Sequence, residues 1–120
     1  MTRMDHEAVA VIVPAHDEEA TIEACIQSVL AALAHARPAA STVVVVADAC
    51  SDRTAALAGE VLRTRGAVVE IDDSCVGTAR RSGAELALAT LGRDCWLAHT
   101  DADSTVPVHW VAEQQRLAAA

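Results

Sequence analysis

The chain has 120 residues, 52% of them hydrophobic, and a formal net charge of −8. This length suits a single domain with a sizeable core, and this hydrophobicity excludes a disordered tail. The acidic balance argues against a nucleic-acid binder and against a polybasic membrane anchor, because both need a basic face.

The first part of the chain predicts two strands with a helix between them. Ala8–Val13 is a continuous apolar run, and Thr42–Ala47 repeats the pattern with four consecutive Val. Strands that are buried on both faces of a parallel sheet have sequences of this kind. Over Glu18–His35 the apolar residues recur at helical spacing, and acidic residues occupy the first turns, where the helix dipole favours them.

A second helix is expected to start after Ser51, a good N-cap residue, and to run to about Arg65. Gly66 is expected to end this helix. Directly after it, Ala67–Ile71 has the composition of a third, weaker strand.

The last part of the chain predicts two further helices and one strand. A helix is expected over about Thr78–Leu91, with Gly92 just past its end. Cys95–His99 is a weaker strand pattern, and a fourth helix is expected to begin near Pro107, because proline is favoured at the first helical position.

The order strand–helix, four times over, predicts an α/β fold. We expect an open, mainly parallel, Rossmann-like sheet of about four strands, with helices on both faces and the two strongest strands at the centre. No linker interrupts the chain, so residues 1–120 are expected to form one domain. Met1–Glu7 is polar and does not resemble a signal peptide.

No apolar run is long enough to span a membrane, and we expect a cytoplasmic protein.

The four cysteines form no C-x-x-C pair and are expected to be reduced thiols, with Cys50 and Cys75 at the edge of a site and the others in the core. The five histidines show no zinc-ligand spacing. Trp96 and Trp110 are expected to be packing anchors.

Polar sequence clusters after every predicted strand. The four clusters are Pro14–Glu19, Asp48–Asp52, Asp72–Gly77 and Thr100–Thr105. Because ligands of open α/β sheets bind beyond the carboxyl ends of the strands, the four clusters are expected to build one site. Neither G-x-G-x-x-G nor G-x-x-x-x-G-K-[ST] occurs, which argues against a dinucleotide dehydrogenase and a P-loop enzyme.

Two carboxylates, Asp101 and Asp103, follow the fourth predicted strand. Alternation along an extended chain would place both on the same side. A pair of hard oxygen donors suits Mg²⁺ or Mn²⁺. The alternative is a solvated turn in which an Asp side chain caps the backbone.

Arg80 and Arg81 lie in the first turn of the third predicted helix, where cations oppose the helix dipole. A bound phosphate would resolve this conflict; otherwise both side chains point into solvent. Since the chain has no Lys, a diphosphate needs a divalent cation, and Asp101, Asp103 and Arg80 are expected to form the clamp.

Three further polar residues lie after the first two predicted strands. Asp48 ends the second strand, where its carboxylate either accepts hydrogen bonds from a base or ribose or caps the next helix. His16 and Asp17 lie after the first strand, and either is expected to cap the first helix.

Four segments resemble the family-two glycosyltransferases of the GT-A fold. Val11–Glu19 resembles V-I-I-P-A-x-N-E-E, Val44–Thr54 resembles V-V-D-D-G-S-x-D-x-T, Gly77–Gly83 resembles G-x-A-R-N-x-G, and Asp101–Ser104 resembles the D-A-D metal motif. Their order and spacing match the family over nearly the whole chain. The sequence departs from the pattern at Asp17, which replaces the common Asn.

The resemblance implies a nucleotide-diphosphate sugar, UDP- or GDP-linked, as donor, with Mg²⁺ or Mn²⁺ and an acceptor that the sequence does not name. It places Pro14, Ala15 and Glu18 in the base and ribose pocket, and Asp48 against the base. Arg80 would lie near the diphosphate. Carried over by position, the donor-binding residues are Pro14, Ala15, Glu18, Asp48, Gly77, Arg80, Asp101, Ala102 and Asp103, of which Asp103 and Asp101 would hold the metal.

In the family the general base and much of the acceptor pocket lie in a following half-domain, whereas this chain ends about 17 residues after Asp103. We therefore expect either a piece that lacks the acceptor half or a site completed in a homodimer; His99 and His109 lie near the metal motif, but nothing marks either as the base. Two other functions stay open. One is a donor-binding or assembly module without turnover, and the other is a nucleotidyltransferase, for which Pro14–Glu19 lacks the Gly-rich basic loop.

Overall fold

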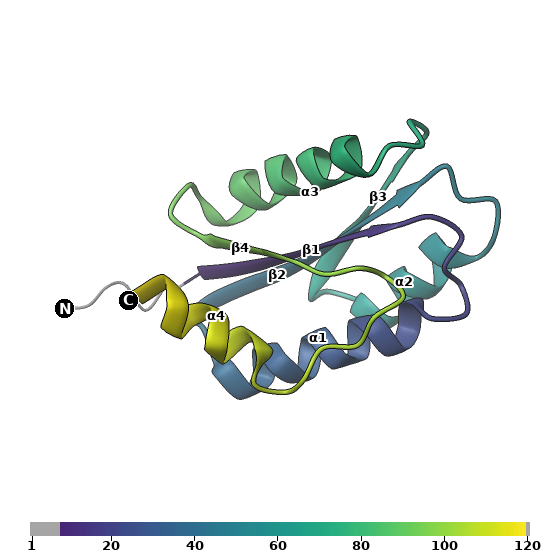
Figure 1. Ribbon diagram of the computed structural model, residues 1–120. Coiled ribbons are helices and arrows are strands. Elements are labelled where there is room, and N and C mark those ends of the chain that lie inside the picture. The colour runs from purple at the N-terminus through teal and green to yellow at the C-terminus, as the bar shows by residue number, and fades with distance from the viewer. Residues whose placement is uncertain (1–7, 120) are drawn as a thin grey trace.

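The computed structural model describes residues 8–119, so Met1–Glu7 and its signal-peptide prediction lie outside the described residues. Within this range, strands and helices alternate along the chain (Figure 1). The elements are β1 (Ala8–Ala15), α1 (Ile22–Ala36), β2 (Ala40–Asp48), α2 (Thr54–Leu62), β3 (Gly66–Ile71), α3 (Val76–Leu91), β4 (Trp96–His99) and α4 (Trp110–Ala119).

The four described strands form one parallel sheet in the order β3-β2-β1-β4. β1 pairs with β2 over the full length of β1, from Ala8 beside Ala40 to Ala15 beside Ala47. The predicted parallel sheet, with the two strongest apolar runs at its centre, is confirmed. Because all strands run the same way, the four polar clusters that follow them lie at one edge.

The two central strands are buried on both faces, and alternate residues point to opposite faces. α1, α2 and α4 cover one face, and α3 covers the other (Figure 1). The strand residues on the α1 face are Val9, Val11, Val13, Val43 and Val45. Those on the α3 face are Ala10, Ile12, Val44 and Val46. This double burial explains why the strand sequences are apolar throughout.

α3 packs closely on the sheet through Gly83. A Cβ atom at this position would lie 2.5 Å from Cγ2 of Ile12 and 3.1 Å from Cγ2 of Val46. Only glycine therefore lets α3 approach β1 and β2 this closely. The last glycine of the Gly77–Gly83 motif has a packing role in this structure.

Several predicted helix ends are wrong, because tertiary contacts fix them. α1 begins at Ile22, four residues later than predicted, after a turn in which Glu18 O accepts the N–H groups of Thr21 and Ile22. α2 spans only Thr54–Leu62, and Ser51 does not cap it. Gly66 begins β3, where a Cβ atom would lie 2.1 Å from the carbonyl oxygen of Val43.

The boundaries of α3 and α4 lie closer to the prediction. α3 begins at Val76 and ends at Leu91, followed by Gly92 in a left-handed conformation with φ of 95°. α4 begins at Trp110, three residues after Pro107. Trp96 and Trp110 pack against the core, as expected.

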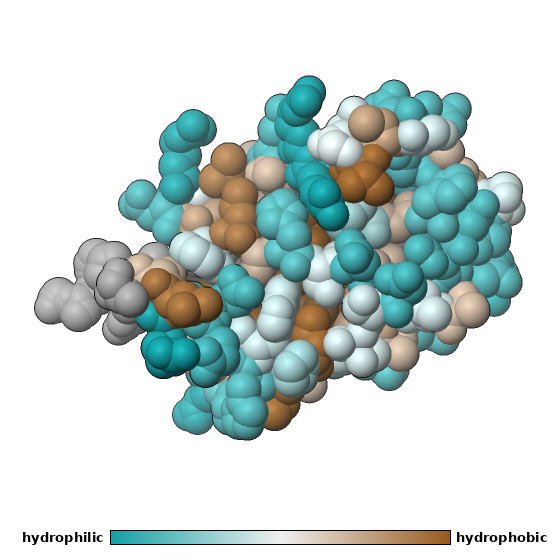
Figure 2. Space-filling model, in the orientation of Figure 1, coloured by the Kyte–Doolittle hydropathy of each residue, from teal (hydrophilic) through white to brown (hydrophobic). Residues whose placement is uncertain are grey.

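Hydrophilic residues cover most of the face shown in Figure 2, and the hydrophobic residues on it form separate small patches. All four cysteines are free thiols. None of the helices in residues 8–119 combines the length and hydrophobicity that crossing a membrane requires.

The packing role of Gly83 predicts opposite effects for two Gly→Ala substitutions in helices. Gly83→Ala should lower the free energy of unfolding by about 1–2 kcal/mol, because overpacking outweighs the gain in helix propensity. Gly59→Ala, in α2 with no atom within 4 Å of the added Cβ, should raise it by about 0.5–1 kcal/mol. Urea unfolding of both variants measures this, and equal stabilisation by both would contradict the close packing.

Candidate functional site

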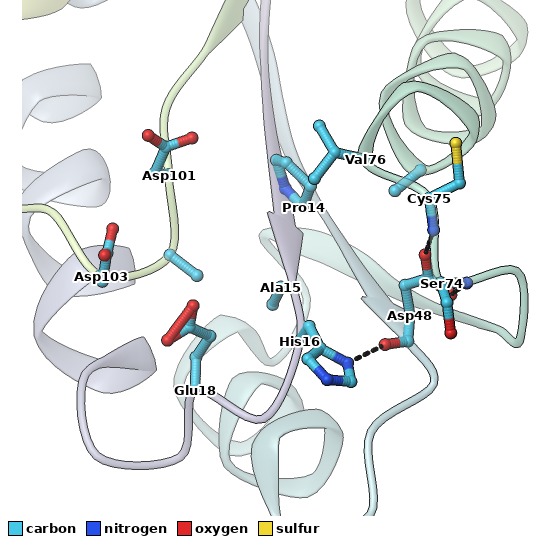
Figure 3. A pocket seen from close by; sticks show the side chains of 12 residues that line it. Pro14, Ala15, His16, Glu18, Asp48, Ser74, Cys75, Val76, Asp101 and Asp103 are labelled. Atoms are coloured by element: carbon cyan, nitrogen blue, oxygen red, sulfur yellow. Dashed lines mark hydrogen bonds between the residues drawn. The ribbon is translucent and has the colours of Figure 1, made fainter.

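A cavity of about 420 Å³ opens at the carboxyl edge of the sheet (Figure 3). The ends of β1 and β2, the first residues of α3 and the loops that follow β1, β3 and β4 contribute to it. Its lining residues are Pro14, Ala15, His16, Glu18, Asp48, Ser74, Cys75, Val76, Ala79, Asp101, Ala102 and Asp103. This volume lies in the range of small-molecule sites.

Most of the predicted donor-binding residues meet at this cavity. Those that line it are Pro14, Ala15, Glu18, Asp48, Asp101, Ala102 and Asp103. Gly77 and Arg80 are not among the lining residues, although both lie in the first turns of α3, whose Val76 and Ala79 do line the cavity. The lining residues that the sequence did not single out as donor-binding are His16, Ser74, Cys75, Val76 and Ala79. Most of these residues are uncharged. The only feature of the sequence that could have pointed to them is their position in or beside one of the four polar clusters.

The Asp48 carboxylate holds the loop between β3 and α3. Its Oδ1 accepts the backbone N–H groups of Asp73 and Ser74, and its Oδ2 accepts that of Cys75, each at 2.8 Å. Ser74 has a left-handed φ of 50°, a conformation that needs such local support in a residue other than glycine. These bonds occupy both acceptor positions of Oδ1 and one of the two on Oδ2. One position on Oδ2 is left for a ligand.

The environment of Asp48 favours its charged form. Burial alone raises the pKa of this carboxyl, but the hydrogen bonds from Cys75, Ser74 and Asp73 together lower it more, with a further contribution from His16. The net pKa therefore lies below its ordinary value, and Asp48 is an anion at neutral pH. His16 Nδ1 lies 2.8 Å from the Asp48 carbonyl oxygen, and this hydrogen bond is the main reason that the pKa of His16 is raised.

A second set of hydrogen bonds ties the loop after β1 to the loop after β2. The Glu18 N–H donates to Oγ1 of Thr54 at 2.8 Å, and Thr54 is completely buried. The Ser51 N–H donates to Oδ1 of Asp17 at 2.7 Å. Asp17 has a left-handed φ of 52°, which Asp and Asn tolerate better than most residues. The prediction that His16 or Asp17 caps α1 is therefore wrong, because both side chains reach across to β2 or its loop.

Two acidic residues complete this connection and cap α2. Oε1 of Glu19 accepts the Arg53 N–H at 2.9 Å, and Oδ1 of Asp52 accepts the Thr54 N–H at 3.0 Å. The Glu19 N–H in turn donates to Oδ2 of Asp52 at 3.2 Å. The pKa of Asp52 is lowered, first by the Thr54 hydroxyl and then by backbone N–H groups. The backbone N–H groups at the start of α2 thus find one of their acceptors on Glu19, a residue of the loop after β1.

The acidic wall of the cavity comes from Glu18, Asp101 and Asp103, whose side chains lie on the same side of it in Figure 3. Asp101 and Asp103 belong to a turn in which the Ser104 N–H donates to the Asp101 carbonyl oxygen at 3.1 Å. The expected alternation along an extended chain is therefore wrong. The turn nevertheless brings both carboxylates to one cavity.

This turn is anchored to α1. Ala102, between the two carboxylates, is 1% exposed. Sγ of Cys25 lies 3.5 Å from the Asp101 carbonyl oxygen, and Oγ of Ser28 accepts the Val106 N–H at 3.0 Å. Burial raises the pKa of Cys25 to about 11, with Asp103 and Asp101 adding to the effect. Cys25 is therefore a thiol that donates its proton, a role that its sequence context did not reveal.

Arg80 reaches the acidic wall from α3, with its guanidinium 3.7 Å from Oδ1 of Asp101. Both side chains are about half exposed or more, so this ion pair is weak and easily rearranged. Of the two carboxylates of the predicted metal motif, Arg80 thus pairs with Asp101. The Asp103 side chain lines the cavity.

The donor set of the acidic wall fits a hard divalent cation. Asp101 and Asp103 offer carboxylate oxygens to one open cavity, as Mg²⁺ and Mn²⁺ prefer. Among residues 8–119, Asp17, Cys50 and Asp52 are grouped more tightly, with ligand atoms within 4.8 Å of one another. Because the carboxylates of Asp17 and Asp52 bind backbone N–H groups of the two loops, this group fits a structural role better.

The opposite wall contains the N-terminus of α3. The pKa of Cys75 is lowered, chiefly by the hydroxyl and N–H groups of Thr78 and the N–H group of Gly77. The Cys75 sulfur thus lies at the positive end of the helix dipole. Pro14, Val76 and Ala79 add apolar surface to this half of the cavity.

Comparison with known proteins identifies a family for this chain. The sequence model of Glycosyl transferase family 2 matches residues 10–120. A search of the curated proteins finds no match.

Among solved structures, residues 1–349 of S. aureus TarS match with a TM-score of 0.67 at 21% identity, and the same TarS segment in complex with UDP matches with 0.70 at 19%. Another crystal structure of TarS gives 0.66 at 21% identity. Each match covers 91% of this chain but only 31%, 31% and 19% of the TarS chains. At these identities the matches show the fold alone.

The three hydrogen bonds of Asp48 predict a strong effect of Asp48→Asn. The amide would retain an acceptor for two N–H groups but would turn its NH₂ group toward the Cys75 N–H, so the melting temperature at pH 7 should fall by roughly 5–10 °C. Because the native pKa of Asp48 is lowered, its contribution is present above the unfolded pKa and lost as pH falls through the native pKa. The variant should therefore lose less stability than the wild type on acidification.

Circular dichroism melting between pH 7 and pH 3 measures both effects. Asp72→Asn, in the same loop and exposed, is the matched control and should shift the melting temperature by less than about 2 °C. Equal melting temperatures and parallel acid limbs for the Asp48 variant and the wild type would show that the carboxylate does not hold the loop.

The connection between the first two loops predicts that Thr54→Val destabilises the chain. Valine has nearly the same shape but leaves the Glu18 N–H without its acceptor, which should cost about 1–3 kcal/mol of unfolding free energy. Thr54→Ser keeps the hydroxyl and should cost less. Urea unfolding compares them, and an undiminished stability of the valine variant would contradict the role of this hydroxyl.

Proposed function

The chain belongs to glycosyl transferase family 2, and from this premise we propose that its cavity binds a nucleotide-diphosphate sugar as the donor of a glycosyl transfer. The observation that carries the proposal is the division of the cavity. Glu18, Asp101 and Asp103 form the acidic wall. The opposite wall, which we call the neutral wall, consists of Pro14, Val76 and Ala79 together with the N-terminus of α3. A donor with a charged diphosphate and a flat base needs two such surfaces.

The nucleoside belongs on the neutral wall in this proposal. Pro14 and Val76 supply apolar surface for the base, and Val76 is 55% exposed, so its side chain is accessible to a ligand. The remaining acceptor position of Asp48 Oδ2 suits an N–H group of the base. Asp48 would then both shape the pocket and contact the base, the role that the resemblance implies.

The diphosphate belongs beside the acidic wall, with Mg²⁺ or Mn²⁺ held by Asp101 and Asp103. When bound, the cation would neutralise diphosphate charge and stabilise the departing nucleotide diphosphate. Glu18 adds a third negative charge to this wall, so a diphosphate without a cation would be repelled. Arg80, released from Asp101, would lie close enough to the α3 N-terminus to add a phosphate contact.

UDP is the nucleotide that we propose to test first, with GDP as its competitor. A TarS structure of the same fold is a complex with UDP. The chain spans about a third of the TarS 1–349 structures, so transfer itself, the acceptor and completion of the site in a homodimer are also proposals.

Donor binding without transfer is the second candidate function. It is favoured by the position of the two histidines nearest the metal motif in the sequence. Neither His99 nor His109 lines the cavity, so neither lies where a general base would meet an acceptor hydroxyl. Release of free sugar from a UDP-sugar at an enzymatic rate would exclude this candidate.

Calorimetry with UDP tests the proposed site. UDP should bind at least about tenfold more tightly with Mn²⁺ than with EDTA, a difference of about 1.4 kcal/mol. Asp103→Asn should remove this metal dependence, because it removes a charged ligand. Asp94→Asn, an exposed carboxylate outside the cavity, is the matched control and should keep it.

The outcomes distinguish the parts of this proposal. Binding of GDP but not UDP would correct the nucleotide and keep the site. Equal UDP affinity with and without Mn²⁺ would contradict the metal role of the acidic wall, and no binding of either nucleotide would contradict the donor pocket.

A further inference from the structure

Two histidines that are far apart in the sequence meet on the surface away from the cavity. His35 lies in the last turn of α1, and His109 directly precedes α4. Nε2 of His35 and Nδ1 of His109 are 3.2 Å apart, and the rings meet edge to face with centroids 4.8 Å apart. Neither residue lines the cavity, and both are exposed.

This nitrogen pair has the spacing of two ligands on one zinc ion. Imidazole nitrogens bind tetrahedral zinc at about 2.0–2.1 Å, which places two such nitrogens about 3.3 Å apart. The two nitrogens lie within hydrogen-bond distance of each other, so a zinc ion would replace this hydrogen bond, with the donor ring carrying its proton on its other nitrogen. Because both side chains are exposed, the ion can enter from solvent, and water can complete its coordination.

The surroundings leave these nitrogens available to a cation. The closest acidic side chain on α4, Glu113, follows His109 by one helical turn and is bound to Arg116 at 2.6 Å. The pKa of Glu113 is lowered chiefly by its hydrogen bond and charge interaction with Arg116, with a smaller contribution from His109. Imidazole is a preferred ligand of Zn²⁺, whereas Mg²⁺ and Mn²⁺ prefer oxygen, so this pair and the acidic wall should select different metals.

We propose that His35 and His109 form a zinc-binding site that joins the end of α1 to the start of α4. A zinc ion there would link segments 74 residues apart in the sequence, in the folded chain only. Binding to the folded state alone stabilises it by mass action. The ion would thus fix α4, whose packing rests mainly on α1, without touching the donor pocket.

Zinc binding and melting temperature test the site together. The full chain should bind one Zn²⁺ in calorimetry and melt at a higher temperature with Zn²⁺ than with EDTA. His35→Ala and His109→Ala should each weaken this binding at least about tenfold and remove the shift in melting temperature. His99→Ala, at another exposed histidine, is the matched control and should retain both.

Two further variants identify where the zinc binds. Cys50→Ser removes the thiol of the Asp17, Cys50 and Asp52 group, and Asp103→Asn removes a carboxylate of the acidic wall; neither should affect zinc binding. Absorption of bound Co²⁺ should lack thiolate charge-transfer bands. Zinc binding that survives both histidine substitutions, or that is lost with Cys50→Ser, would overturn the proposal, as would no zinc binding by the wild type. These outcomes are independent of whether UDP binds.

Discussion

The cavity depends on one buried carboxylate at the end of a central strand. Asp48 is 5% exposed and binds three successive backbone N–H groups of the loop that leads into α3. An anion in this position is stable only because those donors surround it. The loop in turn depends on the anion, since Ser74, with its left-handed φ of 50°, donates its N–H to Asp48. Asp48 therefore fixes the part of the cavity wall that the loop before α3 forms.

The motif residues divide into those that build the edge and those that face the ligand. Asp17, Glu19, Asp52 and Thr54 hold two loops together through backbone N–H groups. Glu18, Asp101 and Asp103 line one side of the cavity. Adjacent residues in the sequence thus have different functions, because a turn sends neighbouring side chains in opposite directions.

The sequence predicted the sheet well, because continuous apolar runs have few explanations other than strands covered on both faces. Seven of the nine residues that the sequence predicted to bind the donor line one cavity in the structure. The sequence did not predict the start of α2, because Glu19 comes from a distant loop, nor the turn at Asp101, which the strand pattern could not distinguish from an extended chain. The contacts between Cys25 and Asp101 and between His35 and His109 join residues that are 74 or more positions apart in the sequence, which no local pattern records.

A crystal structure of the chain with UDP and Mn²⁺ tests the central claim most directly. We expect the base between Pro14 and Val76, the diphosphate and Mn²⁺ beside Asp101 and Asp103, and Asp48 still bound to the N–H groups of residues 73–75. A nucleotide outside this cavity, or an Asp48 side chain that has left the loop to bind the ligand, would contradict the claim that this carboxylate builds the donor pocket.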